Sequence, residues 1–326
     1  MRLIDRLLFY KVAPRQIRYL APLNYSKATG LGLAVIDQLA RDFVVGPPVT
    51  VHLPNPELMA GVWAMGRECL AAGREGREKR ELIAAEVSRL NACPYCVDVH
   101  SAMLHAFDHG DAFTDPALAP YSAWASATLT PDSPLLRNPP FPAAEGPKFL
   151  GTAVCFHYLN RMVNVFLDSA PFTFHGRAIV RMSGKMLRPL VTAQRVEQGD
   201  FLTPAAPSLP TEFEWALADP YIAGGLARFA AAAEAAGAES VEPAVQEFVI
   251  GQVANWRGEA PPLGWTSGQT PTARLALLTA LASYQLDEKV IAAFRQQGKS
   301  DRDLINVTAW ASYVAVKRIA SWLTKT

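Results

Sequence analysis

Apolar residues recur at intervals of three and four along several long segments, and this spacing constrains the fold more than any other feature. Residues 80–90 carry one such stripe, formed by Ile83, Val87 and Leu90, and residues 146–167 and 301–323 carry longer ones. These intervals are typical of amphipathic helices, because they place the apolar side chains on one helix face. Alternating β-branched residues are rare, so the sequence predicts an all-α fold.

Proline and glycine clusters divide the chain. The segments "VVGPPVTVHLPNPE" at 44–57 and "TPAAPSLPTE" at 203–212 are typical of linkers, and "RGEAPPLGWTSGQTP" at 257–271 interrupts the second half. A chain of 326 residues is long enough for two domains of ordinary size. We expect an N-terminal helical arm over residues 1–45, a first lobe over residues 46–202 and a second lobe over residues 212–326.

The two halves resemble each other weakly near their ends. The segment "CFHYLNRMVNVFL" at 155–167 is similar to "SYVAVKRIASWL" at 312–323, and in each a polar residue precedes an arginine, as Asn160-Arg161 and Lys317-Arg318. An ancient duplication explains the similarity; the alternative is that two buried closing helices simply look alike. If the chain is duplicated, the second lobe is a degenerate copy, because the cysteine pair described below has no counterpart there.

The composition excludes several classes of function. The formal net charge is +1 and no long block of like charges occurs, so the sequence offers no surface for nucleic acid or an anionic membrane. No run of about 18 apolar residues is free of charge, and charges interrupt the N-terminal segment, so we expect neither a membrane span nor a signal peptide. Glycine-rich phosphate motifs are absent, and nothing points to haem, flavin, nicotinamide or another cofactor. We expect a cytoplasmic protein.

The segment "LNACPYCVDVH" carries the clearest chemical signal. It places Cys93 and Cys96 three residues apart, and His100 follows four residues later. The chain has only four cysteines, which is not the disulfide framework of a secreted protein. In a reducing compartment, such a pair is more typical of catalysis or metal binding than of a structural disulfide.

Local helix rules place this pair at the start of a helix. Asn91 interrupts the preceding helix, Pro94 suits a first helical turn, and Gly110 is expected to end the new helix. The free N–H groups and the dipole at a helix start favour a thiolate. His100 then lies one turn after Cys96 on the same face, which is the spacing of a nucleophile and its base.

A carboxylate is expected beside this histidine. Glu81 lies about 15 Å from the turn along the preceding helix, and His100 lies about 10 Å from the turn along the next one. If the two helices fold back on each other, Glu81 reaches His100 directly or through water and orients its imidazole. Glu86 is the competing carboxylate, at roughly half that distance from the turn.

These residues together resemble the alkylhydroperoxidase D-like proteins of the carboxymuconolactone decarboxylase superfamily. The matching pattern is Arg80-Glu81-Leu82, followed at the family's spacing by the cysteine pair and the histidine. A weaker resemblance covers residues 54–171 and includes Asn160-Arg161. One position departs from the pattern, because the best-known peroxidase has a histidine where this chain has Tyr95, which puts the full relay and the choice of reductant in doubt.

The resemblance implies a fold, an assembly and an activity. The fold is the helical one of that superfamily, in homo-oligomers such as trimers or hexamers. The activity is a thiol peroxidase in which Cys96 attacks a hydroperoxide and becomes a sulfenic acid, and Cys93 resolves it to a disulfide. Glu81 and His100 form the proton relay, and a dithiol such as a lipoyl group is the reductant.

Alternative readings of the cysteine pair remain open. Structural zinc could use both cysteines, His100, and His105 or His109, but ligands on one continuous helix cannot surround a tetrahedral ion. The superfamily name suggests a lyase acting on a lactone or carboxylate, although such members generally do not depend on this cysteine pair. The pair could also be a non-enzymatic thiol switch, or simply two buried thiols.

For the remaining histidine, arginine and cysteine candidates we favour a structural role over a functional one. His157 is expected to be a buried histidine with satisfied hydrogen bonds, rather than part of a substrate pocket. Arg161 is expected to anchor neighbouring helices rather than clamp a substrate. Cys69 and Cys155 are expected to be packing residues.

Overall fold

The computed structural model describes residues 13–73, 75–107, 115–168, 188, 196–206 and 208–323, and within these ranges the fold is all-α, as predicted. The described residues form no strand, and their one isolated β-bridge joins Ile17 and Leu167. The α-helices are α2 (Gly30–Asp42), α3 (Pro47–Thr50), α4 (Pro56–Gly66), α5 (Arg77–Leu90), α6 (Pro94–His105), α7 (Ala119–Ser126), α8 (Pro134–Arg137), α9 (Gly146–Phe166), α11 (Pro220–Ser240), α12 (Pro243–Asn255), α13 (Pro271–Ala282), α14 (Glu288–Arg295) and α15 (Asp301–Leu323). Shorter helical segments are η1 (Ala13–Gln16), η2 (Tyr25–Lys27), η3 (Arg67–Ala71), η4 (Ala143–Glu145), η5 (Thr211–Ala218) and η6 (Ser283–Gln285).

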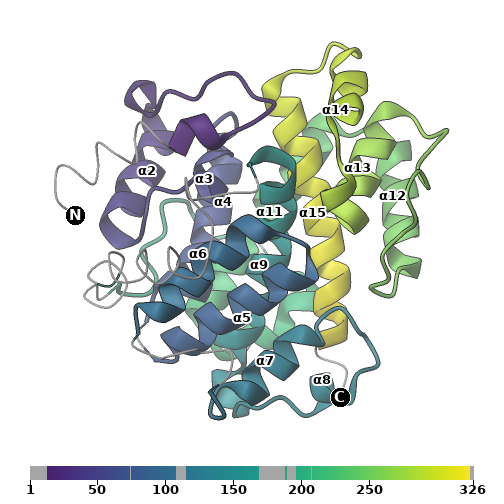
Figure 1. The fold of residues 1–326 in the computed structure, drawn as a ribbon. Helices are drawn as coiled ribbons and strands as arrows, with labels where there is room; N and C mark the ends of the chain where they lie inside the picture. The colour runs from purple at the N-terminus through teal and green to yellow at the C-terminus, as the bar shows by residue number, and fades with distance from the viewer. Residues whose placement is uncertain are drawn as a thin grey trace.

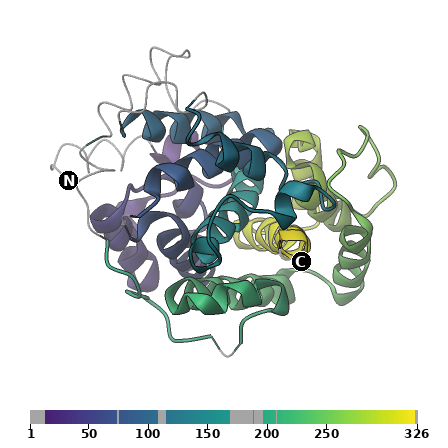
Figure 2. The same cartoon turned by 90° about the horizontal axis from the view of Figure 1, so that it is seen from below.

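The long helices α9, α11 and α15 pack against one another. Helix α15 packs against α9, α11 and α13, while α4 packs against α11 and α5 packs against α6 and α9. The helices of the second half, α12 to α14, lie on one side of α15, and α2 to α6 lie on the other (Figures 1 and 2). None of the described helices is long and apolar enough to cross a membrane.

The two halves of the sequence share one hydrophobic core. Its largest cluster of buried side chains draws on both halves. The ring of Phe229 on α11 meets Tyr158 of α9 edge-on at 4.7 Å between centroids, and meets Tyr313 of α15 at 5.6 Å. Glycine allows α4 and α11 to approach closely, because a Cβ at Gly61 would stand 2.8 Å from the Cβ of Ala232. The division into an arm and two lobes stays a prediction.

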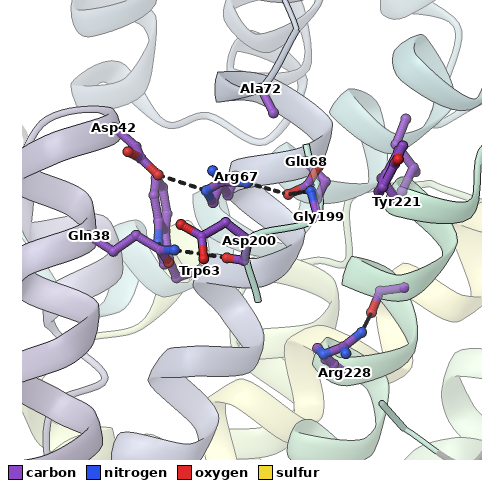
Figure 3. Close-up of polar contacts among 12 residues, drawn as sticks. Gln38, Asp42, Trp63, Arg67, Glu68, Ala72, Gly199, Asp200, Tyr221 and Arg228 are labelled. Atoms are coloured by element: carbon purple, nitrogen blue, oxygen red, sulfur yellow. Dashed lines mark hydrogen bonds and ion pairs between the residues drawn. The ribbon is translucent and has the colours of Figure 1, made fainter. Parts of the chain in front are cut away.

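A buried chain of ionic and polar contacts fixes the segment 196–206 to the first half (Figure 3). Arg67 lies between two carboxylates, donating to Asp42 at 2.8 Å and to Glu68 at 2.6 Å. The Glu68 oxygen that accepts from Arg67, Oε1, also accepts from the backbone N–H of Gly199 at 3.1 Å. Burial raises the pKa of Glu68. These contacts place the returning chain against α2, η3 and α11.

Residues 13–21, which we call the N-terminal strap, tie the beginning of the chain to both halves. The strap runs antiparallel to the end of α9, where the N–H of Arg18 donates to the carbonyl of Phe166 at 2.7 Å. Its far end meets the second half, because the N–H of Ala21 donates to Asp301 at 2.9 Å and Arg295 donates to the carbonyl of Tyr19 at 2.9 Å. The strap thus spans α9 and α15.

Candidate active site

A tight turn joins α5 to α6 and places the cysteine pair at the start of α6. Asn91 ends α5, and Ala92 adopts the left-handed conformation with φ 49°. The N–H of Cys93 donates to the carbonyl of Ser88 at 2.9 Å, and the N–H of Ala92 donates to the carbonyl of Arg89 at 3.1 Å. This is the Schellman pattern of helix ends, and it satisfies carbonyls that would otherwise lack partners. Helix α6 then begins at Pro94, as predicted, with Cys93 in the N-cap position.

The far end of α6 differs from the sequence prediction. The helix ends at His105 and not at Gly110, which lies outside the described residues. The N–H groups of Ala106 and Phe107 bond the carbonyls three residues earlier, so the last turn tightens and the helix stops. Ala106 and Phe107 also pack with Met103 in a small separate apolar cluster.

The α5–α6 hairpin brings the predicted acid and base together. His100 Nδ1 lies 2.6 Å from Glu81 Oε2, and both side chains are buried. Arg77, one turn before Glu81 on α5, donates from Nε to the other carboxylate oxygen at 2.8 Å. Burial alone would favour a neutral acid, but the charges of Arg77 and His100 prevail and hold the pKa of Glu81 at about 2.

This contact fixes the orientation of the imidazole. A carboxylate 2.6 Å from Nδ1 makes that nitrogen the donor, so Nε2 of neutral His100 is the ring atom that can accept a proton. The ring also stands edge-on to Phe156 of α9, with 4.4 Å between centroids. Glu86, the competing carboxylate, is used elsewhere: it accepts from Arg89 at 3.1 Å and from Ser122 at 2.6 Å.

The two cysteines are free thiols in contact with each other, and both are almost completely buried. Cys93 is 1% exposed and Cys96 is 2% exposed. Burial raises the pKa of Cys96 well above its ordinary value, the neighbouring Cys93 raises it further, and the Asn160 amide lowers it. In this arrangement Cys96 is protonated at neutral pH, so reaction requires a base and access for the substrate.

The residue between the cysteines contacts the N-terminal strap. The hydroxyl of Tyr95 donates to Gln16 Oε1 at 3.2 Å, and the Tyr95 side chain is buried. Tyr95 therefore joins the strap to the start of α6.

A buried polar network supports the turn from behind. Arg161 donates to Asn91 Oδ1 at 3.0 Å and to the carbonyls of Ala280 and His157, so it anchors α9 to the turn and to α13. His157 is fully buried and both its ring nitrogens have partners, Asn91 at 3.0 Å and Thr128 at 2.9 Å. The expected structural roles of these two residues are thus confirmed.

Among the described residues, the other cysteines and histidines form no second cluster of this kind. Cys69 and Cys155 are fully buried in the main hydrophobic cluster, as packing residues should be. Within the described ranges, no three or more histidine, cysteine or acidic side chains are grouped so as to hold a metal ion. His109, a candidate zinc ligand, lies outside those ranges.

Sequence reasoning missed three groups that shape this site. Arg77 lies in the mixed charge run at 74–81, and its spacing of four from Glu81 is the available signal. Asn91 was identified only as a helix end, although its side chain bonds α9. Tyr95 meets Gln16 across 79 residues of sequence, and no local pattern reveals such a contact.

Two comparisons with known proteins agree on the ancestry of the chain. The model of the carboxymuconolactone decarboxylase family matches residues 56–108, which include α4, α5 and α6. A protein of Mycobacterium tuberculosis named alkyl hydroperoxide reductase is 32% identical over 340 residues, covering 94% of this chain and 95% of its own length. No solved structure matches significantly. The resemblance noted in the sequence is confirmed, and the chain belongs to the carboxymuconolactone decarboxylase family.

Proposed function

We propose that this protein is a thiol peroxidase that reduces hydrogen peroxide or organic hydroperoxides through Cys96 and Cys93. The observation that carries the proposal is the 2.6 Å contact between His100 and Glu81, one helical turn beyond a cysteine pair at a helix start. The name of the mycobacterial relative, alkyl hydroperoxide reductase, supports the same chemistry.

The first step oxidises Cys96. His100 Nε2 accepts the thiol proton, directly or through a water molecule, and the ionised Glu81 stabilises the resulting imidazolium. The Cys96 sulfur attacks one oxygen of the hydroperoxide, the O–O bond breaks, and the sulfur becomes a sulfenic acid. His100 returns the proton to the departing oxygen, which leaves as an alcohol or as water.

The second step closes the disulfide and prepares the next turnover. The Cys93 sulfur attacks the sulfenic acid of Cys96, a disulfide forms and water leaves. A dithiol of the lipoyl class then exchanges with this disulfide, becoming a cyclic disulfide while both protein thiols are regenerated. The N-cap position of Cys93 and the first-turn position of Cys96 keep the two sulfurs close enough for this closure.

Access to the sulfurs requires a local opening. Both thiols are at most 2% exposed, so a hydroperoxide reaches Cys96 only when a covering group moves. We propose that the contact between Tyr95 and Gln16 is one of those that break, since it links the strap to the residue between the cysteines.

A peroxide-consumption assay with dihydrolipoamide as donor tests the proposal. Cys96→Ser is expected to abolish turnover, whereas Cys93→Ser is expected to react once and hold a sulfenic acid that a dimedone-type reagent traps. Cys155→Ala is the matched control, because Cys155 is a buried thiol of the same core with a packing role. Undiminished turnover in Cys96→Ser would rule out the proposed peroxidase.

A second candidate is a thiol switch without turnover. The near-complete burial of both thiols favours it, because a sensor needs only one slow oxidation. It predicts stoichiometric peroxide consumption that dithiol donors do not make catalytic. A lyase is the remaining alternative, and it predicts lactone turnover that survives replacement of both cysteines by serine. A cytoplasmic location and a homo-oligomeric assembly also remain predictions.

A further inference from the structure

We infer that a small pocket beside the α5–α6 turn binds a monovalent carboxylate, and that Arg161 holds this ligand. The pocket has a volume of about 50 Å³ and lies between the end of α5, helix α9, η6 and residues 256–260. This volume is enough for a few water molecules or for one small ion. The inference is independent of the proposed peroxidase, because no step of that reaction uses this pocket.

Arg161 is a buried cation that pairs with no carboxylate of the described residues. Its side chain is 3% exposed, and burial lowers its pKa to about 9, so the guanidinium stays charged at neutral pH. Arg67 and Arg77 are buried as well, but Arg67 pairs with Asp42 and Arg77 pairs with Glu81. A buried charge without a counter-charge is costly, so an anion from solution is expected to bind beside Arg161.

The hydrogen bonds of Arg161 leave one nitrogen of the guanidinium for a ligand. Nε donates to the carbonyl of Ala280 at 2.8 Å. Nη1 uses its two protons on Asn91 Oδ1 at 3.0 Å and on the carbonyl of His157 at 2.6 Å. The two protons of Nη2 have no acceptor within the described ranges. Coplanar N–H groups of a guanidinium match the two oxygens of a carboxylate.

Ser283 supplies a second donor to the pocket. Its Oγ accepts from Asn164 Nδ2 at 3.0 Å, and its own proton is donated to no group that the structure describes. Ser283 is 4% exposed and lines the pocket together with Arg161. A buried hydroxyl whose proton lacks an acceptor favours a ligand that offers an oxygen.

The remaining walls of the pocket select the charge and the size of the ligand. Three leucines and Trp256 line it, and the centroid of the Trp256 ring lies 5.9 Å from Arg161 Cζ. Glu259 is exposed and also lines the pocket, so it repels a second negative charge on the ligand. One cation, one acid and apolar walls fit a monoanion with a small hydrocarbon end, such as formate or acetate, better than a phosphate dianion.

A titration of ¹³C-formate with the full-length protein tests this site. The ionic strength is kept constant with chloride, and the line width of the formate carbon signal measures binding. We expect a dissociation constant of about 1 mM, which a few hydrogen bonds to charged groups can supply. Acetate should displace formate. Phosphate should not, because of its second charge, and benzoate should not, because it is too large for the pocket.

Two substitutions at the edge of the pocket are expected to change the affinity in opposite directions. Glu259→Gln should tighten formate binding about threefold, because it removes the repelling charge from an exposed position. Ser283→Ala should weaken binding about fivefold, because it removes one donor. The control is Glu247→Gln, an exposed acid on α12 that does not line the pocket, and this variant should bind formate as the unaltered protein does.

Arg161→Met should abolish formate binding. Because Arg161 also anchors α9, this variant is interpreted only if its urea denaturation shows a folded protein, and the two edge variants test the site in either case. Failure of the unaltered protein to bind formate overturns the inference, and the pocket then holds only water. Equal affinities in Glu259→Gln, Ser283→Ala and the unaltered protein also overturn it, because formate then binds elsewhere.

Discussion

Glu81 is an ionised carboxylate held in a fully buried position. A fully buried carboxylate loses its hydration and remains ionised only when partners offset that loss. Arg77 and His100 do so, each bonding a different carboxylate oxygen. Because Arg77 is a permanent cation, the ionised carboxylate always has one buried counter-charge.

Replacing the Glu81 carboxylate by an amide tests its contribution to activity and to stability. Glu81→Gln is expected to lower peroxide consumption about 100-fold, because an amide does not stabilise the imidazolium. It should also lower the free energy of unfolding by about 3 kcal/mol, because Arg77 is left buried without a counter-charge. Steady-state kinetics and urea denaturation measure the two effects.

Glu86→Gln is the matched control for that experiment. Glu86 lies on the same helix, but its partners are Arg89 and Ser122. Peroxide consumption should stay close to that of the unaltered protein, and the free energy of unfolding should change by about 1 kcal/mol. Equal losses of activity in the two variants would contradict a specific role for Glu81.

At the residue scale, the sequence predicts the cysteine pair and the approach of Glu81 to His100 better than it predicts the polar side chains that support the turn. The spacing of Cys96 and His100, and the hairpin distances to Glu81, can be worked out from helix geometry alone. The network behind the turn joins Asn91 to His157 and Asn160 across 66 and 69 residues. Such partners are brought together by packing of α5 on α9, which no local pattern encodes.

At the scale of the elements, the turn between α5 and α6 contains a residue in an unfavourable backbone conformation. Ala92 has φ 49°, a region that favours glycine because a Cβ there approaches the following carbonyl. The Schellman bonds of Ala92 and Cys93 hold the residue in place. The position of Cys93 thus depends on a backbone conformation at Ala92 that is energetically unfavourable for alanine.

Glycine at this position is expected to stabilise the protein. Ala92→Gly should raise the free energy of unfolding by about 0.5–1 kcal/mol, since relief of the left-handed strain exceeds the added backbone entropy of the unfolded chain. Ala102→Gly, in the interior of α6, should instead lower it by about 1 kcal/mol. Urea denaturation of both variants measures the difference; a loss of stability in Ala92→Gly would contradict the strain argument.

Long periodic helices were predicted more accurately than helix ends. The stripes over residues 146–167 and 301–323 correspond to Gly146–Phe166 and Asp301–Leu323. The prediction that α6 ends at Gly110 was wrong. Ala106 and Phe107 turn inward to pack with Met103, although nothing in their sequence breaks a helix.

At the scale of the whole molecule, the buried histidines His52 and His157 should make the protein sensitive to acid. Burial lowers the pKa of His52 to about 4, below the 6.5 of an unfolded histidine, and it lowers that of His157 as well. The unfolded chain therefore binds more protons in this range, so stability is complete above about pH 6.5 and is lost as the pH falls toward 4. His52 alone should contribute a loss of about 3 kcal/mol.

Urea denaturation between pH 7 and pH 4 tests this dependence. The slope of the unfolding free energy against pH should become shallower in His52→Gln, which removes one titrating group. His105→Gln should keep the full slope, because His105 is only half-buried at the end of α6. An unchanged slope in His52→Gln would contradict the assignment to His52.

The all-α class of the whole fold followed from apolar spacing, but the way the halves combine did not. The segment at 44–57 suggested a boundary between an N-terminal arm and the first lobe, and the segment at 203–212 suggested a linker between two lobes. This division stays a prediction, and the described residues of both halves share one hydrophobic core around α9, α11 and α15. Contacts such as that of Phe229 with Tyr158 join helices distant in sequence, and hydrophobicity alone does not specify which helices meet.

The attachment points of the N-terminal strap have a consequence for biosynthesis. The strap leaves the ribosome long before its partner in the second half, because Asp301 follows Ala21 by 280 positions. The segment that reaches the cysteine pair through Gln16 cannot be secured until the last helix has emerged. Until α15 has been made, the nascent chain therefore lacks the contacts that hold the strap over Cys93 and Cys96 at its second-half end.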